Sequence, residues 1–370
     1  MEDRVDFLQC LQTDMGIKIL MHLDDPSDLI HSSAVSRCWR HFVIANGLCK
    51  QLCLRLFPQL FGVACVTEPN CGIGKSADVG SSNSAEWETL EREHRSYSFL
   101  GQTLATFTAS DCMAEAISAS STDNYPEESI CNTLDPRDTV RRRASYWSSK
   151  GQKDPMVPET LIYKLIADLC VITEISVQPF KAYFQPGFPI YSAKYVRFRM
   201  GHPKSPTVIK NDLTDLPMQL PADDKFIWTY TSQEFPMVQE NCLQKFKLPE
   251  PVLCVGGFLM IELLGRVQRQ EMDSLFYICV SHVKVLGRPL YPAFDVEIVE
   301  PSSGKFLLKH YPEAQNCPPP ISPYCHVGNL PLQENLRGLE QLLNMLHGNV
   351  PDLEPHEWDD DENDLDLVLM

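Results

Sequence analysis

The chain has 370 residues, of which 44% are apolar and 22% charged, a composition that excludes a fibrous or a wholly disordered protein. At roughly 150 residues per folding unit, its length predicts two or three domains. Acidic residues outnumber basic ones by 49 to 32. An acidic chain without a basic stripe is a poor partner for nucleic acid or for an anionic membrane, so we expect neither.

The N-terminal residues lack the positive and long apolar regions of a secretory signal, and the longest apolar stretch, 252–261, is shorter than a membrane span. We therefore expect a protein of the cytoplasm, the nucleus or both. The chain has 14 cysteines and no Cys-x-x-Cys pair. This pattern predicts free thiols in reducing surroundings and no structural metal, and no motif predicts a cofactor.

Residues 1–60 have the hydrophobic spacing of a small helical domain. Thr13 can cap a helix, Asp25-Pro26 is typical of a cap followed by proline in the first turn, and Asn46-Gly47 predicts a left-handed helix end. A unit this short cannot bury all of its apolar positions by itself. Its apolar surface either packs on the rest of the chain or binds another protein, and the spacing leaves both open.

Residues 11–52 contain apolar positions at Leu11, Ile17, Leu20 and Leu23, the pair Asp28-Leu29, and the runs Val35-Ser36-Arg37-Cys38-Trp39 and Leu48-Cys49-Lys50-Gln51-Leu52. This pattern resembles the F-box family. Gln12, Ser36 and Cys49 depart from the family pattern, which usually has proline, cysteine and tryptophan at these places. The resemblance implies docking onto the Skp adaptor of a cullin-RING ubiquitin ligase. The positions matching the motif, and therefore our candidate adaptor-binding residues, are Leu11, Ile17, Leu20, Leu23, Leu29, Val35 and Trp39.

Residues 61–109 are predicted to form a linker that contains one helix. Gly, Ser, Asn and Pro dominate 62–84, whereas 87–100 favours a helix with a charged, solvated face. The run Gly72-Ile73-Gly74-Lys75-Ser76 is not interpreted as a phosphate loop, because Pro69 occupies the place of the first glycine.

Residues 110–300 are predicted to form an antiparallel β-sandwich. Short runs rich in β-branched and aromatic residues alternate with turn residues, and few helical signals lie between them. This pattern favours a sandwich over a parallel α/β sheet. The clearest predicted strands are 161–165, 170–177, 193–200, 243–248, 258–264 and 276–286.

The runs at 116–121, 144–151 and 278–287 resemble the galactose-binding-like jelly roll of the discoidin and DOC type. Taken with the N-terminal region, the whole chain resembles a plant-type family of F-box proteins with a β-sandwich receptor domain. The fold class predicted is therefore α+β and multidomain: a helical F-box, an antiparallel sandwich, a C-terminal helix and a disordered acidic tail.

In such a sandwich the loops at one end usually contact ligands. The loop 183–191 contains four aromatic residues, of which we select Phe184, Phe188 and Tyr191 as candidate substrate contacts. Arg197 and Arg199 alternate with apolar residues, so both should face outward. The alternatives are that the aromatics cover the open end of the sandwich and that the arginines form a solvated strand face.

Residues 301–350 are predicted to form a proline-rich segment followed by a helix near 339–346 that docks on the sandwich or recruits another protein. Residues 351–370 contain nine Asp and Glu and no Lys or Arg, which predicts a disordered acidic tail.

No catalytic motif was found, so we expect a non-catalytic protein. The resemblance implies the substrate-recognition subunit of an SCF-type (Skp-cullin-F-box) E3 ubiquitin ligase that binds an unknown target protein. The alternative is a lectin-like sandwich that recognises glycoproteins. A hydrolase on the same sandwich would need two carboxylates in one cleft, and the spacing shows no such pair.

Overall fold

The computed structural model describes residues 6–69, 82–105, 108–137, 139–140, 143–205, 222–300 and 304–316. The predicted helix near 339–346 and the acidic tail at 351–370 lie outside the described residues. Among the described helices none is long and apolar enough to span a membrane.

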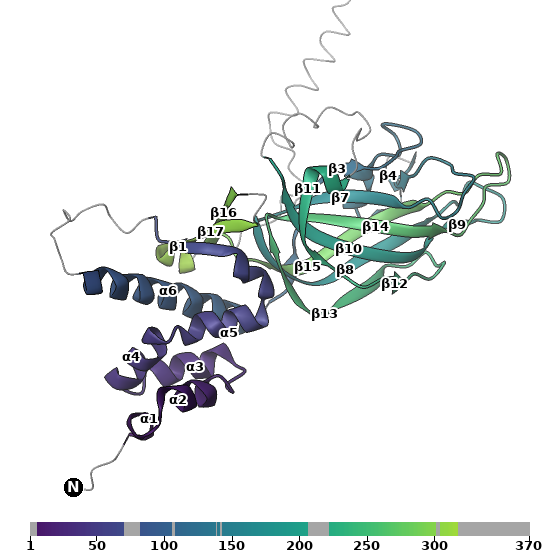
Figure 1. Cartoon of the computed structure of the whole chain (residues 1–370). Coiled ribbons are helices and arrows are strands. Elements are labelled where there is room, and N and C mark those ends of the chain that lie inside the picture. Colours follow the sequence, from purple (N-terminus) through teal and green to yellow (C-terminus); the bar gives the residue numbers. More distant parts are fainter. Residues whose placement is uncertain are drawn as a thin grey trace, which may run out of the picture. The chain divides into compact units, whose positions relative to one another are not determined.

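Five short helices form the N-terminal region (Figure 1). The Asp25 side chain accepts a hydrogen bond from the Ser27 amide at 2.8 Å, and Gly47 has a φ of 57°, so the predicted cap and the predicted left-handed helix end are both confirmed. The prediction that Thr13 caps a helix was wrong: Thr13 is the first helical residue and follows Gln12. The helices are α1 (Phe7–Cys10), α2 (Thr13–Leu20), α3 (Pro26–Ser33), α4 (Arg37–Ala45) and α5 (Leu48–Leu56).

A three-stranded sheet joins two distant parts of the chain. Strand β1 (Val63–Thr67) pairs in parallel with β17 (Lys305–His310), which pairs antiparallel with β16 (Phe294–Glu300). Two expectations change accordingly: 63–67 is a strand instead of linker, and 305–310 is a strand inside the predicted proline-rich segment. Short 3-10 helices at Pro58–Gly62 and Pro312–Asn316 flank this sheet along the sequence.

Between β1 and the sandwich lies helix α6 (Ser82–Ala105), which contains the helix predicted at 87–100. Its residues Tyr97 and Leu100 are fully buried against the N-terminal helices and the three-stranded sheet. The boundaries proposed at residues 60, 109, 300 and 350 stay a prediction.

The β-sandwich consists of two antiparallel sheets, as predicted. The first has the order β11-β10-β14-β7-β3 with β12 beside β10, and the second has the order β13-β8-β15-β2 with β6 beside β15 and β9 beside β8. The first sheet contains β3 (Met113–Ala119), β7 (Glu159–Leu165), β10 (Ala193–Pro203), β11 (Phe226–Thr231), β12 (Phe235–Pro236) and β14 (Phe258–Arg266). The second contains β2 (Ser110–Asp111), β6 (Trp147–Ser148), β8 (Leu169–Lys181), β9 (Ile190–Tyr191), β13 (Gln244–Val255) and β15 (Cys279–Pro289).

The connections of the sandwich carry a small ribbon, a 3-10 helix and one helical turn. Their bounds are β4 (Thr139–Val140), β5 (Arg143–Ala144), η2 (Ile130–Leu134) and α8 (Ala222–Lys225). All six strands predicted from the sequence are present, as β7, β8, β10, β13, β14 and β15.

The sandwich core lies between the two sheets because alternate residues of each strand point inward. On β10, Val196, Phe198 and Met200 are fully buried, whereas Arg197 and Arg199 lie on the outer face, as predicted. Trp147 on β6 is also fully buried in this core.

A second hydrophobic core connects the N-terminal helices with one end of the sandwich. Leu20, Leu29 and Leu52 of the helices share it with residues at the ends of three sandwich strands. They are Leu169 and Val171 of β8, Leu253 and Val255 of β13, and Leu290, which directly follows β15. Part of the apolar surface of the helices is therefore covered by the chain itself.

Candidate functional site

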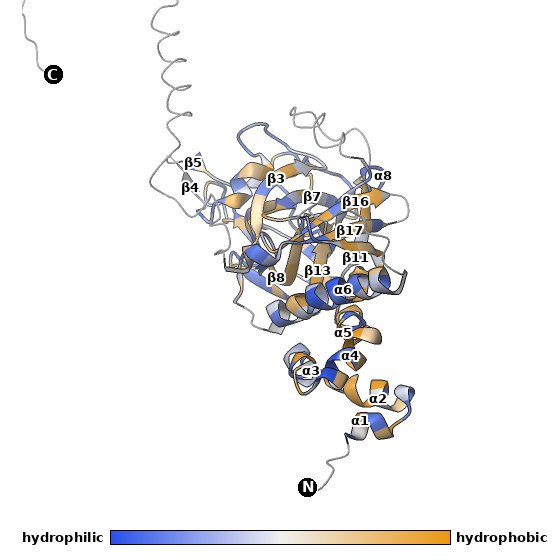
Figure 2. Cartoon of the chain, turned by 90° about the vertical axis from the view of Figure 1, so that its left-hand side faces the viewer, coloured by the Kyte–Doolittle hydropathy of each residue, from blue (hydrophilic) through white to orange (hydrophobic). Residues whose placement is uncertain are grey.

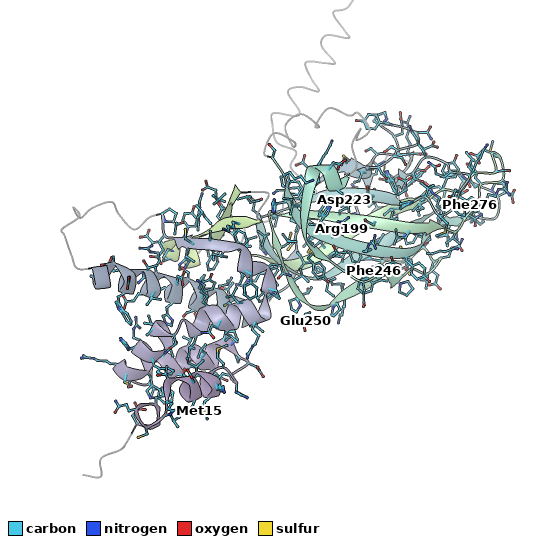
Figure 3. All side chains as sticks on the ribbon, viewed as in Figure 1. Met15, Arg199, Asp223, Phe246, Glu250 and Phe276 are labelled. Atoms are coloured by element: carbon cyan, nitrogen blue, oxygen red, sulfur yellow. The ribbon has the colours of Figure 1, made fainter. Side chains whose placement is uncertain are left out.

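A face of exposed apolar side chains remains on the N-terminal helices. Met15 and Ile19 of α2 are 47% and 43% exposed, and Val35, which precedes α4, is 64% exposed. Much of α2 is hydrophobic (Figure 2), and Met15 is labelled on the same helix in Figure 3. We call Met15, Ile19 and Val35 the helical face.

Trp39 of α4 is partly buried and held by defined hydrogen bonds. Its Nε1 donates to both carboxylate oxygens of Asp6, at 2.9 and 3.0 Å, and its amide donates to the Ser36 hydroxyl at 3.2 Å. A fixed indole with part of its surface open is the kind of side chain that serves as an anchor in protein interfaces.

The predicted adaptor-binding residues divide into three groups by burial. Leu20 and Leu29 are only 4% and 1% exposed and belong to the core of the chain, so their side chains are unavailable to a partner. Val35 is exposed. The remaining four are partly exposed: Leu11, Ile17, Leu23 and Trp39.

Met15 and Ile19 were not among the predicted adaptor-binding residues. These residues are four apart on α2, so they share one face of that helix. The spacing was visible in the sequence, but it did not reveal which side of α2 the rest of the chain covers.

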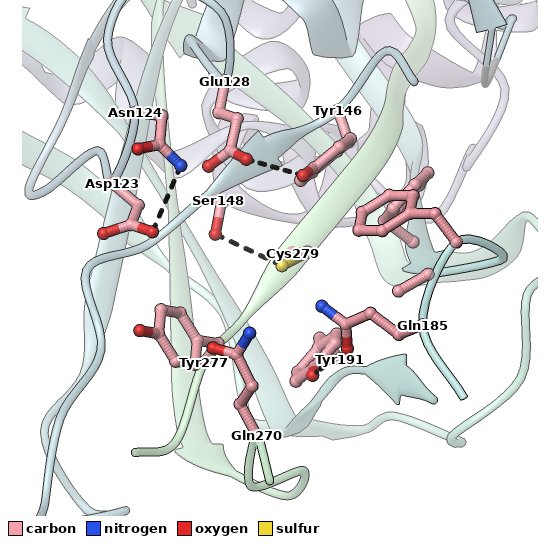
Figure 4. A pocket seen from close by; sticks show the side chains of 13 residues that line it. Asp123, Asn124, Glu128, Tyr146, Ser148, Gln185, Tyr191, Gln270, Tyr277 and Cys279 are labelled. Carbon is pink, nitrogen blue, oxygen red and sulfur yellow. Dashed lines mark hydrogen bonds between the residues drawn. The ribbon is translucent and has the colours of Figure 1, made fainter. Parts of the chain in front are cut away.

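A pocket of about 220 Å³ lies at the end of the sandwich where β8 finishes and β15 begins. Three loops supply most of its wall (Figure 4). The lining residues are Asp123, Asn124, Glu128, Tyr146, Ser148, Phe180, Ala182, Phe184, Gln185, Tyr191, Gln270, Tyr277 and Cys279.

Aromatic rings form one part of the pocket wall. The rings of Tyr146 and Phe180 stack with centroids 3.9 Å apart, and Phe184 lies 6.3 Å from Tyr146. Tyr191 and Tyr277 meet edge to face at 6.2 Å. Two predicted substrate contacts, Phe184 and Tyr191, are therefore in the pocket wall.

The tyrosine hydroxyls of the pocket all donate hydrogen bonds to neighbouring oxygens. Tyr146 donates to Glu128 Oε1 at 2.6 Å, Tyr191 donates to Gln185 Oε1 at 2.6 Å, and Tyr277 donates to Asp273. The rings are thereby fixed in place before any ligand arrives.

Burial and nearby negative charge raise the pKa values of three residues that line the pocket. Burial raises the pKa of Asp123, and repulsion from Glu128 and Asp273 raises it further, against a smaller opposing effect of Lys150. Burial raises the pKa of Tyr191 and of the Cys279 thiol, each to about 12. The Cys279 thiol is consequently protonated and unreactive at neutral pH.

The loop before β9 carries Phe188 next to the pocket but not in its wall. Gly187 and Phe188 have φ angles of 76° and 50°, and the left-handed region is uncommon for a bulky residue. Phe188 is 55% exposed, and the Lys181 ammonium lies 5.4 Å from the centre of its ring.

Arg197 and Arg199, the other predicted substrate contacts, lie elsewhere, on the outer face of β10. Arg197 pairs with Glu262 and with Glu234, the latter at 3.3 Å. Arg199 pairs with Asp223 at 2.8 Å, and Figure 3 shows these two side by side. Their charges are therefore compensated by neighbouring carboxylates, and the structure does not bring them into the pocket.

Comparison with curated proteins identifies a relative that spans nearly the whole chain. "F-box protein At4g00755" of Arabidopsis thaliana is 50% identical over 369 residues, which cover 97% of this chain and 97% of the relative. The chain belongs to the F-box protein family. No model of a known protein family matches it.

Solved structures similar to this F-box protein include galactose-binding-like modules, although the similarity is low. The family 32 module of C. perfringens NanJ, solved with galactose, is 12% identical, with a TM-score of 0.29 over 46% of this chain and 98% of the module. A family 32 carbohydrate-binding module of Streptococcus pneumoniae EndoD gives 11% identity and a TM-score of 0.31, over 48% of this chain and 98% of the module.

In the F-box protein a buried ion pair holds residues that flank two loops of the pocket. Arg266 at the end of β14 is 1% exposed and pairs with Glu159 of β7, which is 2% exposed. Arg266 also donates to the Ser149 hydroxyl at 2.7 Å and to the carbonyl oxygens of Lys150 and Phe276 at 3.1 and 3.2 Å. These residues precede and follow pocket loops, so the pair fixes the loops relative to the sheet.

Within the part of the chain that the structure describes, no group of three His, Cys, Asp or Glu side chains could hold a metal ion.

Proposed function

We propose that this F-box protein is the substrate-recognition subunit of an SCF-type E3 ubiquitin ligase, in which the N-terminal helices dock onto a Skp-type adaptor and the sandwich holds a target protein. The observation that carries the proposal is the 50% identity to an F-box protein along nearly the whole chain. The exposed apolar side chains of the helical face, on the same group of helices as Trp39, would offer a surface to the adaptor.

In this proposal the protein does no chemistry itself. A receptor that holds a target close to a ubiquitin-charged enzyme accelerates transfer by turning a bimolecular encounter into a nearly unimolecular one. Strand β8 is suited to this role because Leu169 at its start packs with the helices and Phe180 near its end lines the pocket. At about 3.3 Å per residue, the eleven residues from one to the other span roughly 36 Å.

The first test is co-purification of the full-length protein with a Skp-type adaptor after substitution of the helical face. We expect Val35→Asp to weaken adaptor binding by at least about tenfold, because it places a charge in an apolar contact without changing the core. The matched control is Val299→Asp on β16, since Val299 is 57% exposed and lies outside the helices. Equal adaptor binding by Val35→Asp and the wild type would refute docking through this face.

Carbohydrate recognition is a second candidate function, favoured by one feature of the pocket. Aromatic faces and the side-chain amides of Asn124, Gln185 and Gln270 occur together in its wall. Aromatic rings that stack on sugars and amides that bond their hydroxyls would suit a glycoprotein target. Selective binding to a glycan array would favour this candidate.

A further inference from the structure

The charged residues that line the pocket all have the same sign. Asp123 and Glu128 are the charged members of the described lining, which contains no Lys, Arg or His. Asp273, which accepts the Tyr277 hydroxyl, adds a third carboxylate next to the wall. Lys150 acts on Asp123 electrostatically but does not line the pocket.

The hydrogen-bonding capacity that remains in the pocket includes an unused carboxylate oxygen. The three tyrosine hydroxyls already donate to neighbouring oxygens. Glu128 uses Oε1 to accept from Tyr146, whereas its Oε2 is buried and has no hydrogen-bond partner among the described residues. A buried acceptor without a donor costs free energy, which a donor brought by a ligand would recover.

The aromatic wall adds an attraction for positive charge. The faces of aromatic rings are electronegative, and cations positioned over them are stabilised, most strongly where water is excluded. Figure 4 shows Tyr146, Tyr191 and Tyr277 around the same space that Glu128 and Asp123 face. Rings and carboxylates thus favour the same kind of group.

The size of the pocket and its surroundings indicate a side chain of a larger partner. A volume of about 220 Å³ is below the range of about 300–1,000 Å³ that is usual for sites of drug-sized ligands. Large apolar residues from the same three loops stand exposed around it: Tyr125 at 52%, Tyr183 at 42%, Phe184 at 55% and Met272 at 92%. An exposed apolar rim of this kind marks a protein interface.

We propose that this pocket receives a positively charged side chain, lysine or arginine, of the target polypeptide, while the exposed aromatic rim contacts the residues on either side of it. This inference rests on the proposed function, because it assumes that the sandwich holds a protein. The cation would form charge-assisted hydrogen bonds with Glu128 and Asp123, which are stronger than bonds between neutral groups.

The test uses the full-length protein and four probes. Three are blocked pentapeptides of glycine with a central lysine, arginine or norleucine, and the fourth is methyl β-galactoside. Saturation-transfer NMR measures their binding. Norleucine keeps most of the apolar length of lysine and removes its charge, so it separates attraction of the cation from burial of the stem.

We expect the lysine or the arginine peptide to bind and the norleucine peptide and galactoside to bind at least about tenfold more weakly. Asp123→Asn with Glu128→Gln should weaken binding of the cationic peptide by a similar factor, since these changes remove charge and keep shape. Glu250→Gln is the matched control, because Glu250 is an exposed carboxylate on β13 that does not line the pocket (Figure 3). Unchanged melting temperatures would show that the variants are folded.

Three results would overturn the inference: equal binding of the norleucine peptide, binding of the galactoside in preference to both cationic peptides, or no binding of either cationic peptide. None of these depends on the adaptor. Loss of the cationic site with normal adaptor capture would leave the proposed receptor function standing, whereas the failure of Val35→Asp to affect the adaptor would count against the proposed docking face itself.

Discussion

Replacing Arg266 by methionine tests whether the buried pair of Arg266 and Glu159 is needed for stability. The substitution keeps an unbranched apolar stem and removes the guanidinium, which donates to Glu159, the Ser149 hydroxyl and the carbonyl oxygens of Val157, Lys150 and Phe276. Glu159 would retain hydrogen bonds from the hydroxyls of Ser120 and Ser121, but its charge would have no partner.

The expected magnitude follows from that burial. Removing one member of a buried ion pair leaves an uncompensated charge and costs about 3–5 kcal/mol. An exposed pair contributes at most about 1 kcal/mol. Lys309→Met is therefore the matched control, since it removes a cation that pairs with the exposed Glu297 at 2.7 Å on the three-stranded sheet.

The assay is urea unfolding of both variants beside the wild type, followed by intrinsic fluorescence and far-UV circular dichroism. If the free energy of unfolding has the same slope against urea concentration in the variant and the wild type, a lower midpoint for Arg266→Met reports the loss of stability directly. A cost below about 1 kcal/mol, or one equal to that of Lys309→Met, would refute the reasoning that the pair is buried and needed. The double substitution Arg266→Met with Glu159→Gln should recover part of the loss, because it removes the unpaired charge.

Two further predictions concern titration. Burial, helped by Arg40, lowers the pKa of His94 to about 4, and burial also lowers the pKa of His310 although Glu68 opposes this. In the unfolded chain these histidines become protonated near pH 6.5, whereas in the folded chain they stay neutral to lower pH. The free energy of unfolding should therefore fall as pH decreases from about 6.5 to 4. Urea midpoints that did not change across this range would contradict the prediction. The Cys279 thiol, whose pKa burial raises to about 12, should resist iodoacetamide at neutral pH in the folded protein while the exposed Cys38 reacts, as judged by mass spectrometry of the alkylated peptides. Equal rates at the two cysteines would contradict it.

The sequence predicted those parts of the fold whose signals are local. Asp25-Pro26 and Asn46-Gly47 mark helix ends through their own backbone preferences, and the alternation along β10 correctly placed Val196 inside. The pairing of β1 with β17 was missed, because a five-residue strand has no partner in its sequence neighbourhood that would reveal it. The helix ends at Asp25 and Gly47 were predicted, whereas the cap at Thr13 was predicted wrongly and the long-range sheet was missed.

The candidate site was predicted in part for a related reason. Phe184 and Tyr191 were found because aromatic residues crowd one loop. Asp123 and Glu128 share one loop, Tyr277 comes from another loop far along the sequence, and only folding brings the three to one cavity. Arg197 was predicted to face outward and does, but Glu262 on the neighbouring strand β14 compensates its charge, a contact that spacing along one strand cannot show.

The parallel pair of β1 and β17 means that this protein has no simple place to be divided. A fragment that began after β1, and so lacked both the N-terminal helices and this strand, would leave β17 as an open edge, which is a template for unwanted association. It would also uncover Leu169, Val171 and Leu253, which the helices now shield from water. The N-terminal segment, which would hold the ligase, and the sandwich, which would hold the target, therefore fold together. Each covers apolar surface of the other that would favour aggregation if it were exposed.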